Sequence, residues 1–160
     1  MASDYYLLLT GIEGETEAEG MKNALELQSW GFSARSDADM GGSGLSAGKP
    51  AHADFSCTFE LDKSSFQLLS NLHKGTHIDS ATFSGRKVGG NATPYTYLVV
   101  SLTKVFVTSF DTGGGPTGVP VASLGLAYQE IVYQYYTQST DGTVTLAGQS
   151  SYDRKTLKAA

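Results

Sequence analysis

Cysteine is almost absent from this sequence, since Cys57 is the single one among 160 residues. A lone cysteine excludes an intramolecular disulfide and a metal site built from several thiolates. The sequence therefore predicts a chain that folds in a reducing compartment. We expect Cys57 to be a small core residue rather than a nucleophile, because it falls on the inward face of an alternating segment.

Charged residues are also few. They make up 17% of the chain, and 16 acidic against 11 basic residues give a net charge of -5. A protein that binds nucleic acid by neutralising phosphates needs an excess of Lys and Arg, so this class is excluded. The low charge indicates that part of the surface contacts protein rather than water.

Long apolar runs are missing as well. No stretch approaches the roughly 18 residues that span a bilayer. The N-terminal sequence MASDYYLLLTGIEGET lacks a basic segment before its short apolar run, so we expect no signal peptide. The length fits a single domain over residues 1–160. We expect synthesis in the cytoplasm and, if the chain is secreted, a route that needs no signal peptide.

Catalytic motifs are not found either. No serine lies in a G-x-S-x-G pattern, and His52, His73 and His77 lack a metal-binding spacing such as H-E-x-x-H. We predict surface or helix-capping positions for the three histidines, no metal, no cofactor and no enzymatic activity. A hydrolase centred on these histidines remains an alternative.

What the sequence does contain is the two-residue repeat of β-strands. Apolar and polar residues alternate over residues 53–61, which predicts a half-buried strand. Residues 94–110 carry apolar groups on both faces and predict a long central strand that is covered on each side. Residues 122–138 are similar, with a bulge expected around Gln129 and Glu130. Weaker strand candidates are residues 5–10, 22–33 (with a bulge at Gly31), 78–88 and 143–152.

One segment has helical spacing instead. Ser64 and Gln67 are placed as a capping box, and Gly75 follows as a stop, which predicts one short helix over about residues 65–73. We expect Leu68, Leu69 and Leu72 to share its inner face. Many strands with one helix predict a mostly β fold, a compact two-sheet barrel or a sandwich.

A glycine-rich segment, residues 37–51, separates two of the strands. Gly42, Gly44 and Ala47 satisfy the dinucleotide pattern G-x-G-x-x-G/A literally, but no strand precedes it and no helix follows it. The P-loop pattern fails because Ser43 and Pro50 stand where a glycine and a hydroxyl residue are required. The segment is therefore not expected to bind phosphate.

The length of this segment points to another role. Loops beyond about 12–15 residues are uncommon unless they bind something. Ordering the backbone costs about 1 kcal/mol per residue, and only Met40 and Leu45 are available for burial in return. We predict a loop that is mobile alone and becomes ordered when it docks on another protein surface. The residues assigned to this assembly loop are Met40, Gly41, Gly42, Gly44, Leu45, Gly48 and Lys49.

The order and spacing of several motifs resemble the Hcp tube proteins of bacterial type VI secretion systems. The matching positions lie along nearly the whole chain, and Phe66 departs from the pattern by standing where a proline often begins the helix. The positions are Gly11, Gly14, Glu15 and Thr16; Ser29, Trp30 and Gly31; Met40, Gly41, Gly42, Gly44, Gly48 and Lys49; Asp62 to Ser65 and Gly75; Arg86, Lys87, Gly89 and Gly90; Leu98 to Ser109; Gly113 to Gly115; Tyr136, Gln138, Asp141 and Gly142; Tyr152 and Asp153. Ser43, Leu45 and Ser46 also depart from the pattern, because the loop of the family is often nearly all glycine.

The resemblance implies a two-sheet β-barrel with one helix that assembles into hexameric rings. It also implies that the rings stack into a tube inside a contractile sheath, carry a VgrG-type spike, hold effectors in the lumen and are expelled from the cell. The long loop would reach neighbouring subunits. The alternative is a barrel whose glycine loop closes over a glycan or lipid, using Trp30 and the tyrosines Tyr128, Tyr133, Tyr135 and Tyr136.

Overall fold

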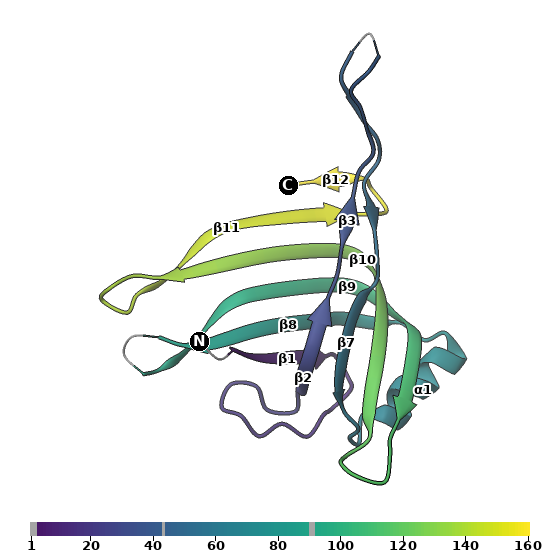
Figure 1. Ribbon diagram of the computed structural model, residues 1–160, viewed down its shortest axis with the longest axis vertical. Coiled ribbons are helices and arrows are strands. Elements are labelled where there is room, and N and C mark those ends of the chain that lie inside the picture. Colours follow the sequence, from purple (N-terminus) through teal and green to yellow (C-terminus); the bar gives the residue numbers. More distant parts are fainter. Residues whose placement is uncertain (1–2, 43, 90–91) are drawn as a thin grey trace.

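The computed structural model describes residues 3–42, 44–89 and 92–160. It contains twelve strands and one helix within these ranges (Figure 1). In chain order they are β1 (Ser3–Leu9), β2 (Leu25–Gly31), β3 (Ala34–Arg35), β4 (Ala38–Asp39), β5 (Ser46–Ala47), β6 (Ala51–His52), β7 (Phe55–Glu60), α1 (Ser65–Lys74), β8 (Ile78–Val88), β9 (Pro94–Gly113), β10 (Val121–Gln138), β11 (Val144–Asp153) and β12 (Lys158–Ala159).

Six of the strands close into a barrel. The sheet order is β12-β11-β10-β7-β2-β1-β8-β9, and β10 also pairs with β9, so β10, β7, β2, β1, β8 and β9 form a closed ring. All of these pairings are antiparallel. Strand β11 extends the sheet beyond the second half of β10, and β12 pairs with the last residues of β11. The expected barrel is confirmed. Closure satisfies both edges of the ring strands, which removes the usual edge-strand problem.

The barrel interior is filled by the inward side chains of the alternating strands. In β7, Phe55, Cys57 and Phe59 are buried and the residues between them are not, which confirms the predicted alternation. Burial raises the pKa of the Cys57 thiol to about 12, so it is a core residue with an inert thiol. An aromatic cluster lies beside these residues, and the centroids of the Trp30 and Phe83 rings are 4.4 Å apart.

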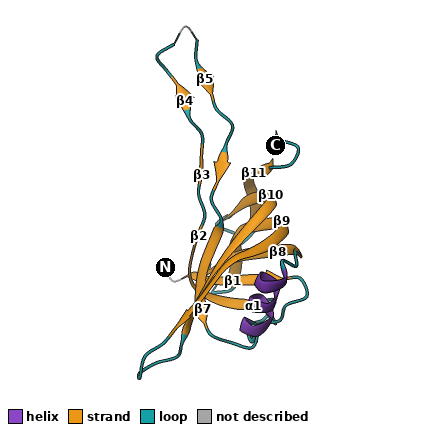
Figure 2. Ribbon diagram, turned by 90° about the vertical axis from the view of Figure 1, so that its right-hand side faces the viewer, coloured by secondary structure: helices purple, strands orange, loops and turns teal. Residues whose placement is uncertain are grey.

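The long strand predicted at residues 94–110 is β9, and it lies between β8 and β10 as expected. Its two faces differ, however. Val100 and Leu102 are buried in the barrel, whereas Phe106 on the outer face is 45% exposed. Helix α1 contacts β9 (Figure 2), and its Leu68 belongs to the same buried cluster as Val100 and Leu102. The prediction that both faces are covered is therefore wrong within this chain, because the core covers the inner face of β9 and leaves Phe106 on the other face exposed.

Two predicted bulges lie elsewhere. The register between β2 and β7 shifts between Leu27 and Ser29, not at Gly31. In β10 the register shifts between Gly125 and Leu126 against β9, and between Tyr135 and Tyr136 against β11. Near Gln129 the phase does change, but without a net register shift. Tyr128 and Ile131 are both buried although they lie three residues apart. The ladder between β9 and β10 omits Gln129 and the opposite residue Lys104, which adopts φ 55°, so both strands are irregular at the same point.

The helix is confirmed, with one error at its start. Gly75 adopts φ 65° and its N–H bonds to the carbonyls of Asn71 and Leu72, which ends the helix as predicted. The predicted capping box is wrong, because the Ser64 hydroxyl donates to Asp62 and the side-chain amide of Gln67 donates to the carbonyl of Gly11 at 3.0 Å.

The inner face of the helix is narrower than predicted. Leu68 is fully buried and Leu72 is partly buried, but Leu69 is 37% exposed and does not share the inner face. At ten residues, α1 is the longest helix in the described ranges, and none there is long and apolar enough to cross a membrane.

Candidate assembly surface

The glycine-rich segment forms a two-stranded arm that projects from the barrel (Figure 2). Strand β3 pairs with β6 near the barrel, and β4 pairs with β5 farther out. The pairing of the two halves of the segment was not among the predictions, and the predicted mobility of the isolated loop stays a prediction. The arm does not fold back over its own barrel (Figures 1 and 2).

Short-range hydrogen bonds hold the two halves of the arm together. The Ser36 hydroxyl donates to the carbonyl of Gly48 at 2.8 Å, and the N–H of Gly48 donates to the carbonyl of Asp37. A side chain at Gly48 would bring a Cβ within 3.3 Å of that carbonyl, so glycine permits the close approach. Near the tip, the N–H of Gly41 donates to the Asp39 carboxylate at 3.0 Å.

The arm buries no apolar side chain. Described residues from Ala34 to Ala51 are all exposed, with Met40 at 73% and Leu45 at 79%. Full burial of a side chain of this size stabilises a structure by about 1.5–3 kcal/mol. The arm tip therefore carries two exposed apolar side chains, and both lie far from the core of their own barrel.

At the arm root, the structure places a cationic cleft of about 430 Å³. The cations Lys49, Arg154 and Lys155 line it together with His52 and Tyr152. The His52 ring stacks on Tyr152, with 5.0 Å between the ring centroids, and its Nδ1 atom has no hydrogen-bond partner. Burial and the charge of Arg154 lower the pKa of His52, which favours the neutral form of the ring.

The other two histidines have ordinary surface positions, as predicted. His73 is exposed in the last turn of α1, where a basic side chain complements the helix dipole. His77 lies 3.3 Å from the Asp79 carboxylate, and both side chains are exposed. No group of three or more metal-ligating side chains occurs among the described residues.

The glycine turn after β1 lies at the end of the molecule opposite the arm (Figure 1). Gly11 has φ 81°, and the N–H of Gly14 donates to the carbonyl of Asn23 at 2.8 Å. A Cβ at Gly14 would lie 2.4 Å from the carbonyl oxygen of Ala24, so only glycine fits there. This packing directs Glu15 into a cleft of about 320 Å³. The other acidic residues lining that cleft are Glu26, Glu60 and Asp62.

The remaining motif positions support the barrel. Arg86 donates to the carbonyl of Glu19 at 2.9 Å, which ties β8 to the turn after β1. The Lys87 ammonium lies 4.7 Å from the ring centroid of Tyr97. A side chain at Gly89 would collide with Gln138, and Gly90 lies outside the described residues.

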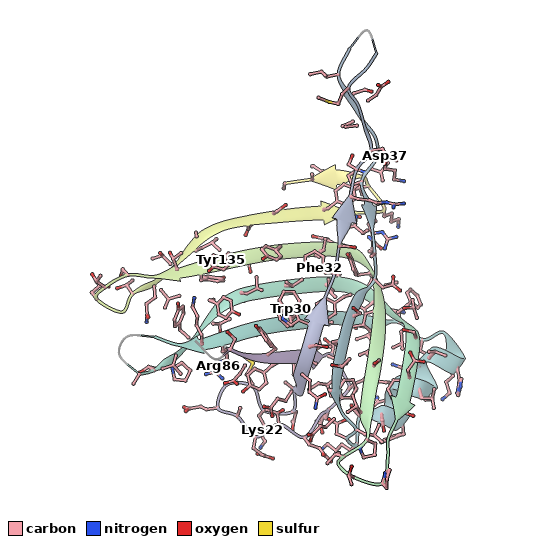
Figure 3. The ribbon with its side chains drawn as sticks, viewed as in Figure 1. Lys22, Trp30, Phe32, Asp37, Arg86 and Tyr135 are labelled. Carbon is pink, nitrogen blue, oxygen red and sulfur yellow. The ribbon has the colours of Figure 1, made fainter. Side chains whose placement is uncertain are left out.

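The tyrosines named for the glycan- or lipid-binding alternative have separate partners, and of the four Tyr128 lines the cationic cleft. The Tyr128 hydroxyl donates to the carbonyl of Ala53 at 3.1 Å, Tyr133 packs on Phe32, and Tyr135 meets Tyr97 edge to face. The Trp30 ring lies inside the aromatic cluster, as Figure 3 shows. The geometry required by the glycan- or lipid-binding alternative, an arm closed over these rings, is not found.

Sequence reasoning missed the two clefts. Arg154 and Lys155 follow β11, whereas Lys49 belongs to the arm, and Glu26 and Glu60 lie on two paired strands. These residues meet only through the strand order. Counting charges along the chain gives no signal for such sites.

Comparison with known proteins gives a consistent result. The family model described as "Type VI secretion system effector, Hcp" matches residues 6–135. Protein hcp1 of Pseudomonas aeruginosa is 32% identical over 90 residues, an alignment that spans 56% of this chain and 55% of that protein, so about half of each is compared. The crystal structure of Hcp1 from Salmonella typhimurium superposes with a TM-score of 0.81 at 26% identity, over 100% of both chains. A structure of a type six secretion system protein superposes with a TM-score of 0.91 at 23% identity, over 99% of this chain and 100% of that one, and shows the fold.

Proposed function

Because the chain belongs to the Hcp family of type VI secretion system tube proteins, we propose that it is a structural subunit that assembles into hexameric rings. In this proposal the rings stack into the inner tube of the secretion machine. The observation that carries it is the arm, whose apolar tip is exposed on the isolated chain.

The energetics of the arm support docking on another copy. Ordering the arm costs about 1 kcal/mol per residue, and its two-residue ladders bury no apolar side chain in return. Seating Met40 and Leu45 against a neighbour supplies the missing burial. The same contact repeated from copy to copy builds larger assemblies. A head-to-tail interface gives a closed ring when the rotation between copies closes on itself, and an open stack when it does not.

The other parts of the proposal follow from the family. The partners are further copies of the chain, a VgrG-type spike, contractile sheath proteins and effectors carried in the lumen. The tube assembles in the bacterial cytoplasm and is then secreted without a signal peptide. The subunit has no enzymatic role in this proposal, in agreement with a family of structural tube proteins.

Deletion of residues 41–47 tests the arm directly. We expect a folded barrel that has lost the stable ring or stacked assembly, because the deletion removes the tip but leaves the barrel core intact. Light scattering and electron microscopy of the purified protein give the size and shape of the particles, and circular dichroism confirms the fold.

A point variant gives the matched control. Met40→Ser with Leu45→Ser removes the apolar tip, whereas Val119→Ser removes an exposed apolar residue from the β9–β10 turn. The first variant should weaken assembly and the second should not. Unchanged assembly after deletion of the tip would refute docking by the arm, and a wild-type chain that is monomeric at every concentration would refute the tube subunit itself.

A further inference from the structure

The two clefts carry opposite charges and lie toward opposite ends of the barrel. The cationic cleft is at the root of the arm, and the acidic cleft is beside the turn after β1. Figure 3 labels Asp37 on the arm and Lys22 in the turn that also carries Glu15, and these lie toward the two ends of the long axis (Figures 1 and 3). Opposite placement means that one copy can offer its acidic end to the cationic end of the next.

The cationic cleft is held rigidly. The backbone N–H of Arg154 donates to the carbonyl of Gln129 at 2.8 Å, and its guanidinium donates to the carbonyl of Tyr128 at 3.0 Å. The one carboxylate in this turn, Asp153, accepts the backbone N–H groups of Lys155 and Thr156, which lower its pKa. Asp153 is therefore occupied by its own turn, and the lysine ammonium groups remain available.

Neither cleft is neutralised by an ion pair among the described residues. The ion pairs found there are Lys63 with Glu13 and His77 with Asp79, and neither pair includes a residue that lines these two clefts. Lys49, Lys155 and the three glutamates of the acidic cleft are all exposed. The two clefts therefore expose charges of opposite sign that can pair with another molecule.

We propose that the carboxylates of the acidic cleft of one copy bind the cationic cleft of the next copy. The ligand class is a cluster of protein carboxylates, and the partner is a second copy of this chain. The contact is heterologous, so it repeats from copy to copy. Complementary charges of this kind fix orientation and register and make assembly sensitive to salt. This inference rests on the proposed self-assembly and adds a second contact to that of the arm tip.

Charge reversal tests the inference. The double variant Lys49→Glu/Lys155→Glu should weaken the association at least about tenfold, because like charges would then face each other across the contact. Glu26→Lys/Glu60→Lys should weaken it similarly. The quadruple variant should restore association to within about threefold of wild type, since both sides are reversed together. Arg154 is left unchanged because it supports the fold.

The matched control separates the contact from overall charge. Each Lys→Glu reversal lowers the net charge by two from -5, so Lys49→Glu/Lys155→Glu and the control Lys74→Glu/Lys104→Glu both carry -9, and the quadruple variant returns to -5. The control residues line neither cleft. Sedimentation velocity over a concentration series, at low and at high salt, gives the association constants, and circular dichroism checks folding.

The outcomes are distinct. Weakening by each double variant, restoration by the quadruple variant and little effect of the control support the inference. If the cleft variants assemble like the wild type, or if the quadruple variant fails to recover although it is folded, the inference is wrong while assembly through the arm stands. A wild-type chain that does not assemble at all overturns the proposed function instead.

Discussion

The barrel and the arm are built in contrasting ways. Each of the six ring strands pairs with two others of the ring, and their inward side chains form one continuous core that includes Phe55 and Phe83, both with no exposed area. The arm has two ladders of two residue pairs each and no buried apolar side chain. The barrel is therefore stabilised by its own packing, whereas the arm would gain burial from another molecule in the proposed assembly.

Thiol chemistry should show the largest difference between the two regions. With its pKa at about 12, the Cys57 thiol has a thiolate fraction at pH 8 about 10³-fold below that of an ordinary exposed cysteine. A cysteine introduced by Leu45→Cys should therefore react with a thiol reagent at least about 10³ times faster than Cys57. Mass spectrometry of each labelled site measures both rates. Comparable rates in the folded chain would contradict the assignment of Cys57 to the core.

The core comes next in size of effect. Phe83→Ala should lower the free energy of unfolding by about 3–5 kcal/mol, because it leaves a cavity beside Trp30, Tyr5 and Phe55. Denaturation with urea, followed by tryptophan fluorescence and by circular dichroism, measures the change. A loss below about 1 kcal/mol would show that the cluster does not stabilise the barrel.

Two glycines offer a smaller contrast. Gly14→Ala should cost about 1–3 kcal/mol, because the added methyl group would collide with the backbone carbonyl of Ala24. Gly44→Ala in the arm meets nothing within 4 Å and should change the stability by less than about 0.5 kcal/mol. Parallel urea titrations compare the two variants, and equal effects would refute the close approach at Gly14.

The smallest effect is expected at the arm tip. Met40→Ser with Leu45→Ser should leave the unfolding free energy of the dissociated chain within about 0.5 kcal/mol of the wild type, because neither side chain is buried. The measurement is made at a concentration where light scattering shows monomers. A clear destabilisation of the monomer would mean that the tip packs on its own barrel in solution.

Local patterns predicted the local structure well. The alternation around Cys57 identified β7, the bounds expected for β8 agree with Ile78–Val88, and Gly75 ends the helix. These features depend on neighbours in the sequence, on side-chain period and on the conformational freedom of glycine. The predicted capping box was wrong, because Ser64 hydrogen-bonds to Asp62 and Gln67 hydrogen-bonds to Gly11 instead.

The assembly surface could be predicted only in part. The exposed arm residues were identified, because a long glycine-rich segment with two apolar side chains has little to bury. Its pairing into β3–β6 and β4–β5 was not predicted, since two-residue ladders leave no periodic signal. The position of the bulges was also missed, because a bulge depends on the register of the partner strand.

By itself, the sequence determined the strand-rich barrel, the single helix, the buried cysteine and the unusual segment around Met40, because period, composition and turn residues act over a few neighbours along the chain. The tertiary structure alone decided that Lys49 and Lys155 line one cleft and that Glu26 and Glu60 line another at the opposite end of the barrel. The physical reason is that strand order and barrel closure bring these residues together, and no local pattern encodes which distant strands become neighbours.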